Sequence, residues 1–323
     1  MTGVLVGTDD GVQQFDDGVA GPRELAGRRV HALARRRDDW WAIADGAVVL
    51  RRDPTGTWND VATAGTDLTC LLPTADGAWC GTVDGHLLRL FGEVFTVVGG
   101  FDAIAGRETW KAVGSRVPYV RSITTTADDR SLLAGVHVGG IAHSGNGGAS
   151  WKPTIDVDAD VHEVRADPGD AKLVLAPAAV GLAVSRDGGA SWDVTTEGLH
   201  ATYLRAVAFT TDAALVSASE GPSADRGALY RWDVTTGGPL TKAEDGLPEW
   251  LDGNIETGAL DAHRETAAFA DGSGTVYASS DGGRSWTALA SELGHVHAVG
   301  ITGPAVGITG PAGVGTLGDP YGG

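Results

Sequence analysis

The sequence predicts an all-β chain folded as a seven-bladed β-propeller. A short pattern of an aliphatic, a polar, a small and an apolar residue occurs seven times, at intervals of roughly 40 to 50 residues. This spacing is typical of one propeller blade. A turn pattern, Ser-x-Asp/Asn-x-Gly-x-x-Trp, occurs three times, and its paired glycines suit the positive φ angles of a tight turn.

We expect the seven copies of the short pattern to form the innermost strand of each blade. They lie at residues 30–33, 68–71, 120–123, 161–164, 204–207, 255–258 and 296–299. A second apolar strand follows a short polar turn, as at 40–44, 78–81, 132–135 and 173–176. A third strand, as at 181–184, precedes the Ser-x-Asp turn, and an outer strand completes the blade.

The two ends of the chain are expected to share one blade. Residues 4–27 supply three strands without an inner one, whereas 296–301 supply an inner strand alone. Their combination closes the ring and leaves no open sheet edge. The sequence therefore predicts a single propeller domain over 1–302, followed by an irregular Gly- and Pro-rich tail over 303–323.

Charge and hydropathy limit the partners. The formal net charge is −18, and only four of the 24 basic residues are lysines. Such an acidic chain is not expected to bind nucleic acid or an anionic membrane non-specifically. Residues 1–7 look like a strand rather than a signal peptide, and no apolar run reaches the length of a membrane helix. We expect a cytoplasmic monomer.

The Ser-x-Asp turn resembles the Asp-box, or bacterial neuraminidase repeat. The resemblance implies a hairpin between the third and fourth strands of a blade, in which the Asp caps backbone N–H groups and the Trp covers the turn. A degenerate copy keeps the same Asp-to-Trp spacing. The copies are 144–151, 185–192 and 279–286, with the degenerate one at 53–58. The lysine-poor acidic composition also resembles that of proteins from salt-accumulating haloarchaea.

The chain also resembles two groups of box-bearing propellers. Soluble photosystem II stability/assembly factors carry an arginine in the inner strand, as do Arg121 and Arg205 here. Haloarchaeal and actinobacterial box-repeat proteins labelled glycosyl hydrolase-like share the strings at 137–141, 156–162 and 197–203. Sialidases share the box, but the nearest string to their F/Y-R-I-P motif, at 21–25, does not match. No sialidase catalytic residue is therefore assigned.

The polar second residue of each inner strand should point to one mouth of the central channel. These residues are His31, Thr69, Arg121, His162, Arg205, Glu256 and His297. Loops on the same face should add further side chains, namely Trp110, His137, Asp156, Asp158, Asp160, His200, Tyr203 and Trp250.

Two functions fit this set of residues. In the first, the mouth binds a small molecule or a protein segment: Arg121 and Arg205 would hold a carboxylate or phosphate, the aromatic rings would stack, and a histidine would move protons. Its binding residues would be Trp110, Arg121, His137, His200, Tyr203, Arg205, Trp250 and Glu256. In the second, the protein is a metal-dependent enzyme of hydrolase, lyase or oxygenase type, and a divalent transition metal is bound by His31, His162 and His297.

Overall fold

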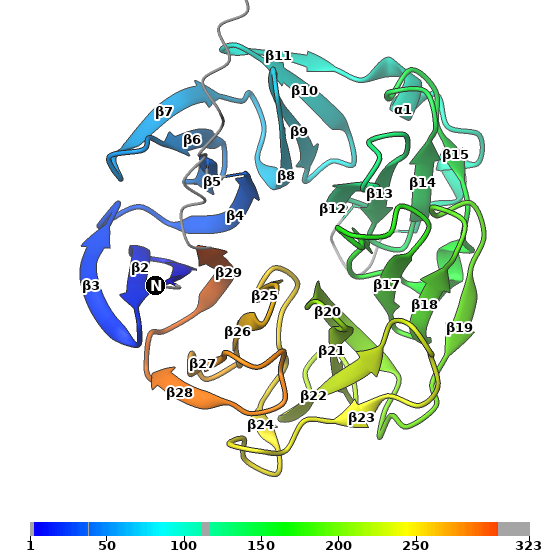
Figure 1. Cartoon of the computed structure of the whole chain (residues 1–323). Coiled ribbons are helices and arrows are strands. Elements are labelled where there is room, and N and C mark those ends of the chain that lie inside the picture. The colour runs from blue at the N-terminus through cyan, green and yellow to red at the C-terminus, as the bar shows by residue number, and fades with distance from the viewer. Residues whose placement is uncertain (1–2, 38, 112–116, 303–323) are drawn as a thin grey trace, which may run out of the picture.

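Seven antiparallel sheets surround a central axis in the computed structural model, which describes residues 3–37, 39–111 and 117–302 (Figure 1). The predicted seven-bladed β-propeller is confirmed. Six sheets have four strands, and the sheet of blade 6 carries a fifth, short strand. Helical structure in the described residues is limited to short turns, namely α1 (Gly99–Asp102), η1 (Arg107–Thr109) and η2 (Val157–Ala159).

Blades 1 to 4 each have four strands, named in order from the axis outward. Blade 1 contains β29 (Val296–Thr302), β1 (Gly3–Thr8), β2 (Gly11–Asp16) and β3 (Val19–Glu24). Blade 2 contains β4 (Val30–Arg36), β5 (Asp39–Ala44), β6 (Val48–Arg52) and β7 (Trp58–Thr63). Blade 3 contains β8 (Leu68–Thr74), β9 (Gly77–Thr82), β10 (Leu87–Phe91) and β11 (Val94–Val97). Blade 4 contains β12 (Val120–Thr125), β13 (Leu132–Val136), β14 (Gly140–Ser144) and β15 (Lys152–Pro153).

Blades 5 to 7 complete the ring. Blade 5 contains β16 (Arg165–Ala166), β17 (Val174–Ala178), β18 (Gly181–Ser185) and β19 (Asp193–Thr195). Blade 6 contains β20 (Tyr203–Phe209), β21 (Ala213–Ser219), β22 (Arg226–Asp233) and β23 (Thr241–Lys242), and β24 (Leu251–Asp252) pairs with β22. Blade 7 contains β25 (Leu260–His263), β26 (Thr266–Ala270), β27 (Val276–Ser279) and β28 (Thr287–Ala290).

Blade 1 is built from both ends of the chain, as the sequence predicts. β29 pairs antiparallel with β1, so that Val299 lies opposite Val6 and Ile301 opposite Val4. All four side chains are nearly or fully buried. Because apolar side chains from both ends pack together, the ring closes through a hydrophobic contact as well as through backbone hydrogen bonds.

Most inner strands contain a β-bulge near their second residue. The register of β4 skips His31, that of β8 skips Thr69 and that of β12 skips Arg121. The ladders of β20 and β29 have comparable shifts. A bulged residue has no ladder partner and is turned out of the regular pleat. The bulge therefore frees the polar side chain of this position to reach a neighbouring blade.

Two predicted inner strands begin later than expected. In blade 5, residues 161–164 make only the isolated bridge of Val161 with Ala178, and β16 starts at Arg165. In blade 7, residues 255–258 precede β25 and end in a turn at Gly258, whose φ is +84°. The backbone N–H of Val164 donates to Ser122 Oγ on blade 4 instead of to its own sheet. Contacts between blades thus replace part of the ladder.

The Ser-x-Asp turns lie between the third and fourth strands of blades 4, 5 and 7. In blade 5, Asp187 Oδ1 accepts hydrogen bonds from the backbone N–H groups of Ala190 and Ser191, at 3.0 and 2.9 Å. The Trp residues are not equally buried. Trp286 is 4% exposed and Trp151 8% exposed, whereas Trp192 is half-buried.

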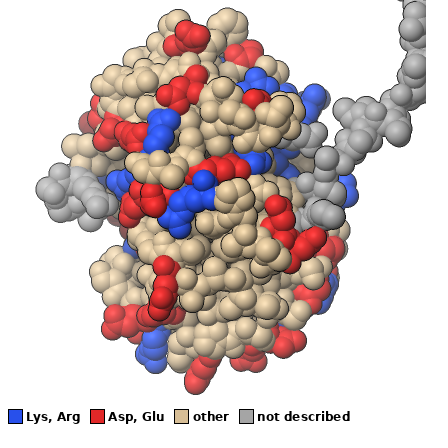
Figure 2. All heavy atoms as spheres, turned by 90° about the vertical axis from the view of Figure 1, so that its left-hand side faces the viewer, with Lys and Arg blue, Asp and Glu red and all other residues tan. Residues whose placement is uncertain are grey.

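Charged side chains of both signs are mixed over the surface. Figure 2 views the molecule from the left-hand side of Figure 1 and shows acidic groups scattered among basic ones. Arg28, for example, pairs with Asp45 at 2.7 Å and with Asp60 at 2.8 Å. In the described part of the chain, no helix has the length and apolar character needed to cross a membrane.

Candidate functional site

A polar cavity of about 500 Å³ opens where the inner ends of blades 1, 2, 3, 4 and 7 meet. We call it the mouth pocket. Its polar lining consists of Arg29, His31, Asp67, Thr69, Tyr119, Arg121, Glu256, Thr257, His295 and His297. It continues into a channel cavity of about 320 Å³ along the axis, since His31, Thr69, Arg121 and Thr257 line both spaces.

Four blades each bring two side chains to this pocket, one directly before the inner-strand pattern and one at its second position. The pairs are Arg29 and His31, Asp67 and Thr69, Tyr119 and Arg121, and His295 and His297. Blade 7 adds Glu256 and Thr257. Four of these residues were not predicted from the sequence, namely Arg29, Asp67, Tyr119 and His295. Each lies two positions before the polar residue of an inner-strand pattern, and this position would have identified it.

His31, Thr69 and His162 each connect one blade to the next. The His31 Nε2 atom lies 2.8 Å from the carbonyl oxygen of Leu68, and Thr69 Oγ1 donates to the carbonyl of Val120 at 2.5 Å. The Nδ1 atom of His162 lies 2.5 Å from the carbonyl oxygen of Leu204. Since a carbonyl only accepts, these ring nitrogens carry the proton. Burial lowers the pKa of both histidines, which are therefore neutral links between blades.

His297 belongs to a different cluster. Its Nε2 atom lies 2.8 Å from Asp9 Oδ1, and its ring meets that of His295 edge-on at 4.4 Å. Within residues 3–37, 39–111 and 117–302, no group of three or more His, Cys, Asp or Glu side chains is placed to hold a metal ion. The predicted metal ligands His31, His162 and His297 thus gain no support from their positions.

Arg121 is available to a ligand. It is half-buried, and its guanidinium lies over the Tyr119 ring at 5.7 Å. It makes no hydrogen bond or ion pair with any residue that the structure describes, yet it lines both the mouth pocket and the channel. A guanidinium held on an aromatic face is pre-organised for bidentate binding of a carboxylate or phosphate.

Arg205 is already engaged, unlike Arg121. It forms an ion pair with Glu256 and donates to the carbonyl of Pro222 at 3.0 Å. Its guanidinium also lies over the Tyr203 ring at 5.3 Å. A ligand anion would have to displace Glu256 to reach it. Both arginines were expected to hold an anion, but only Arg121 is free of an ion pair with a described residue.

His137, Asp160 and His162 form a second cluster on blades 4 and 5. Asp160 Oδ2 lies 3.6 Å from His162 Nε2, and Asp160 Oδ1 lies 3.9 Å from His137 Nε2. Both distances are too long for hydrogen bonds. The Tyr203 ring lies 4.5 Å from that of His162, and Asp160 has a φ of +49°. This cluster does not line the mouth pocket.

Other predicted binding residues lie elsewhere. His200 Nδ1 contacts the Tyr230 hydroxyl at 2.8 Å, and the Trp250 ring lies 4.8 Å from His200 and 4.0 Å from Lys242 Nζ. This cluster belongs to the outer strands of blade 6, because Tyr230 lies on β22 and Lys242 on β23.

The remaining loop residues are also engaged away from the pocket. Trp110 packs on Phe101 at 5.8 Å and under Arg107 at 4.4 Å. Asp156 caps η2 by accepting from the Asp158 backbone N–H, and Asp158 pairs with Lys111.

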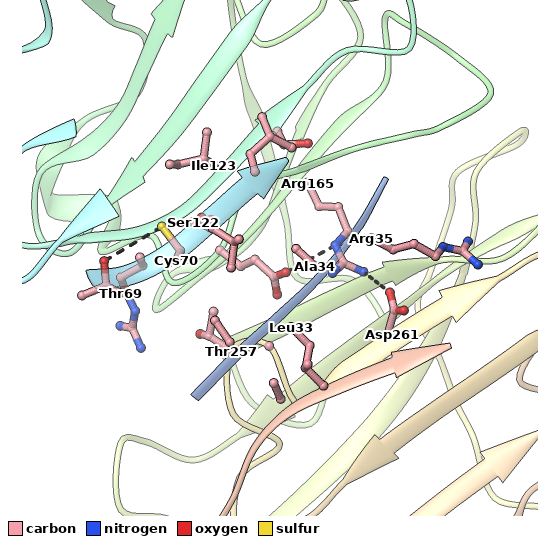
Figure 3. A pocket seen from close by; sticks show the side chains of 18 of the residues that line it. Leu33, Ala34, Arg35, Thr69, Cys70, Ser122, Ile123, Arg165, Thr257 and Asp261 are labelled. Atoms are coloured by element: carbon pink, nitrogen blue, oxygen red, sulfur yellow. Dashed lines mark hydrogen bonds and ion pairs between the residues drawn. The ribbon is translucent and has the colours of Figure 1, made fainter. Parts of the chain in front are cut away.

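The channel holds an ionic group that the sequence analysis did not single out. Figure 3 shows Arg165 reaching across to Asp261, with 3.0 Å between Nη1 and Oδ1. Glu163 Oε2 accepts from the backbone N–H of Val207 at 3.0 Å, and Asp261 Oδ2 accepts from that of Ile301 at 2.9 Å. Burial raises the pKa of Glu163 to about 7. Glu163 and Arg165, two charged residues at alternate positions of one inner segment, were the available signal in the sequence.

No protein-family model matches the chain, and no curated protein matches it. Solved structures do resemble it. A GH74 enzyme from Niastella koreensis has a TM-score of 0.59 at 16% identity, covering 80% of this chain and 45% of that protein. Virginiamycin B lyase from Staphylococcus aureus has a TM-score of 0.56 at 10% identity, covering 77% and 80%. YCF48 bound to D1 peptide has a TM-score of 0.46 at 14% identity, covering 89% and 77%.

The similarities to the GH74 enzyme and to virginiamycin B lyase show the propeller fold and nothing finer, because both identities lie far below those that preserve a site. The chain spans less than half the length of the GH74 enzyme that it matches. The site must therefore be interpreted from its own residues.

Proposed function

We propose that the protein is a binding module that takes a small anionic ligand at the mouth pocket, with Arg121 holding its carboxylate or phosphate. One observation carries this proposal: Arg121 lines the pocket, and its guanidinium forms no ion pair or hydrogen bond with a described residue. A volume of about 500 Å³ lies in the range of small-molecule sites. A small molecule is therefore favoured over the protein segment that the sequence also allowed. We retain a cytoplasmic monomer as part of the proposal.

Titration calorimetry of Arg121→Ala tests the proposal, with hexanoate and inorganic phosphate as probes at one fixed salt concentration. A charge-assisted hydrogen bond is worth about 1.5–3 kcal/mol, so the affinity should fall by roughly tenfold to a hundredfold. Arg121→Lys should lie between wild type and Arg121→Ala, because an ammonium group keeps the charge and loses the planar fork.

Arg186→Ala is the matched control. Its guanidinium lies over the Trp232 ring at 5.7 Å, an arrangement like that of Arg121, but outside the mouth pocket. The control should bind both probes as wild type does. Equal affinities of wild type and Arg121→Ala would refute the proposal.

The metal-dependent enzyme remains the alternative, although no observation in the described residues favours it. Elemental analysis after supplementation with zinc, copper, iron and manganese separates the two functions. A stoichiometric metal that is lost in His162→Ala and His297→Ala would establish the alternative. We expect no stoichiometric metal.

A further inference from the structure

The mouth pocket also contains an unpaired negative charge. Asp67 lies directly before β8, its side chain is exposed, and it lines the pocket. In the part of the chain that the structure describes, its carboxylate has neither an ion pair nor a hydrogen bond. It is therefore free to contact a ligand that Arg121 holds.

The other charges of the pocket compensate one another. Glu256 pairs with Arg205, and Arg29 pairs with Asp9, at 3.3 Å between Nε and Oδ1. Burial keeps His31 and His297 below their usual pKa, so both are neutral at pH 7. Arg121 and Asp67 then remain as one positive and one negative group that line the same cavity and form no ion pair with a described residue.

The two charged groups come from neighbouring blades. Asp67 precedes the inner strand of blade 3, and Arg121 lies in the inner strand of blade 4. The Thr69 hydroxyl donates to the carbonyl of Val120, which holds the start of β8 against the start of β12. This link lies two residues after Asp67 and one before Arg121, so it fixes the backbone positions from which the two side chains extend.

We propose that the ligand of the mouth pocket is a small zwitterion, whose carboxylate binds Arg121 and whose ammonium group binds Asp67. The inference rests on the proposed function and adds the second recognition element. Complementary charges at both ends of a ligand fix its orientation.

A chain-length series tests this inference by calorimetry. The probes are glycine, β-alanine, 4-aminobutyrate and 6-aminohexanoate, each compared with the monocarboxylate of the same length. One chain length should match the separation of the Arg121 and Asp67 side chains. At that length the amino acid should bind about threefold to tenfold more tightly than the monocarboxylate of the same length. In Asp67→Asn this ratio should fall to about one, with no loss of monocarboxylate affinity.

Asp193→Asn is the control, because Asp193 is exposed on β19 and lies outside the mouth pocket. It should keep the wild-type ratio. Ratios near one at every length in the wild-type protein overturn the inference, and so does a ratio that Asp67→Asn leaves unchanged. Monocarboxylates that bind Arg121→Ala as well as wild type would instead overturn the proposed function itself.

Discussion

At the scale of single residues, His162 shows how position and environment decide a role. The sequence places it in a ring of polar residues at the channel mouth, and this position suggested that its side chain binds a metal ion. The structure buries it completely and directs its Nδ1 atom at the Leu204 carbonyl. We therefore expect His162 to contribute to the stability of the fold.

We expect His162→Ala to lower the free energy of unfolding by about 2–4 kcal/mol, because it leaves a buried carbonyl unpaired and creates a cavity. Urea denaturation measures the change. His263→Ala is the control, since His263 is only half-buried and its side chain makes no hydrogen bond to a described residue. A midpoint for His162→Ala equal to that of the control would contradict the structural role.

Glu163 gives a second prediction at this scale. Burial raises its pKa from 4.5 to about 7, so the folded protein binds this proton more tightly than the unfolded chain does. The contribution to stability is complete below pH 4.5 and is lost as the pH rises towards 7. The loss should amount to about 1–3 kcal/mol.

Glu163→Gln should remove this pH dependence, because its amide oxygen can still accept from the Val207 N–H. Stability measured in urea at several pH values for both proteins checks the prediction. Parallel curves for the two proteins between pH 4.5 and 7 would show that Glu163 does not titrate in this range.

At the scale of elements, the repeated turn could be recognised from the sequence, but the burial of its Trp could not. Trp286 packs against Phe269 at 4.9 Å between ring centroids and is 4% exposed. Trp192 occupies the same turn position but is half-buried, with its Nε1 donating to Thr154 Oγ1 at 3.1 Å. A local pattern does not describe these contacts.

Trp286→Ala should therefore destabilise the protein by about 3–5 kcal/mol, the range of buried Trp truncations. Trp192→Ala should cost less than Trp286→Ala, because the Trp192 side chain is only half-buried. Thermal unfolding at one salt concentration compares the two. The reverse order of melting temperatures would contradict this difference in packing.

The inner strands could also be predicted only in part from the sequence. Five of the seven predicted segments lie in strands of the expected blades, namely β4, β8, β12, β20 and β29. The segments at 161–164 and 255–258 do not, because their backbone groups bond to other blades or close a turn. Five of the seven predicted mouth residues line the mouth pocket, namely His31, Thr69, Arg121, Glu256 and His297. The pairing of Arg205 with Glu256 depends on side chains from two blades and could not be predicted from the repeat.

At the scale of the whole molecule, the net charge of −18 should make stability depend on salt. Like charges repel one another in the compact state, and salt screens them, with a Debye length of about 3 Å at 1 M. We expect the melting temperature to rise between 0.1 and 1 M KCl, and NaCl at equal ionic strength to act alike. A flat or falling melting temperature would exclude self-repulsion as a significant term.

The closure of blade 1 has a consequence for chain connectivity. Thr302 lies directly opposite Gly3 in the antiparallel pair of β29 and β1, which is the spacing of residues joined by a hairpin. A two-residue linker could therefore join these positions, and the backbone could be cut instead in an exposed loop between two other blades. Such a circular permutant would keep every strand pair of the seven blades, because the propeller is a closed ring in which the position of the break is arbitrary.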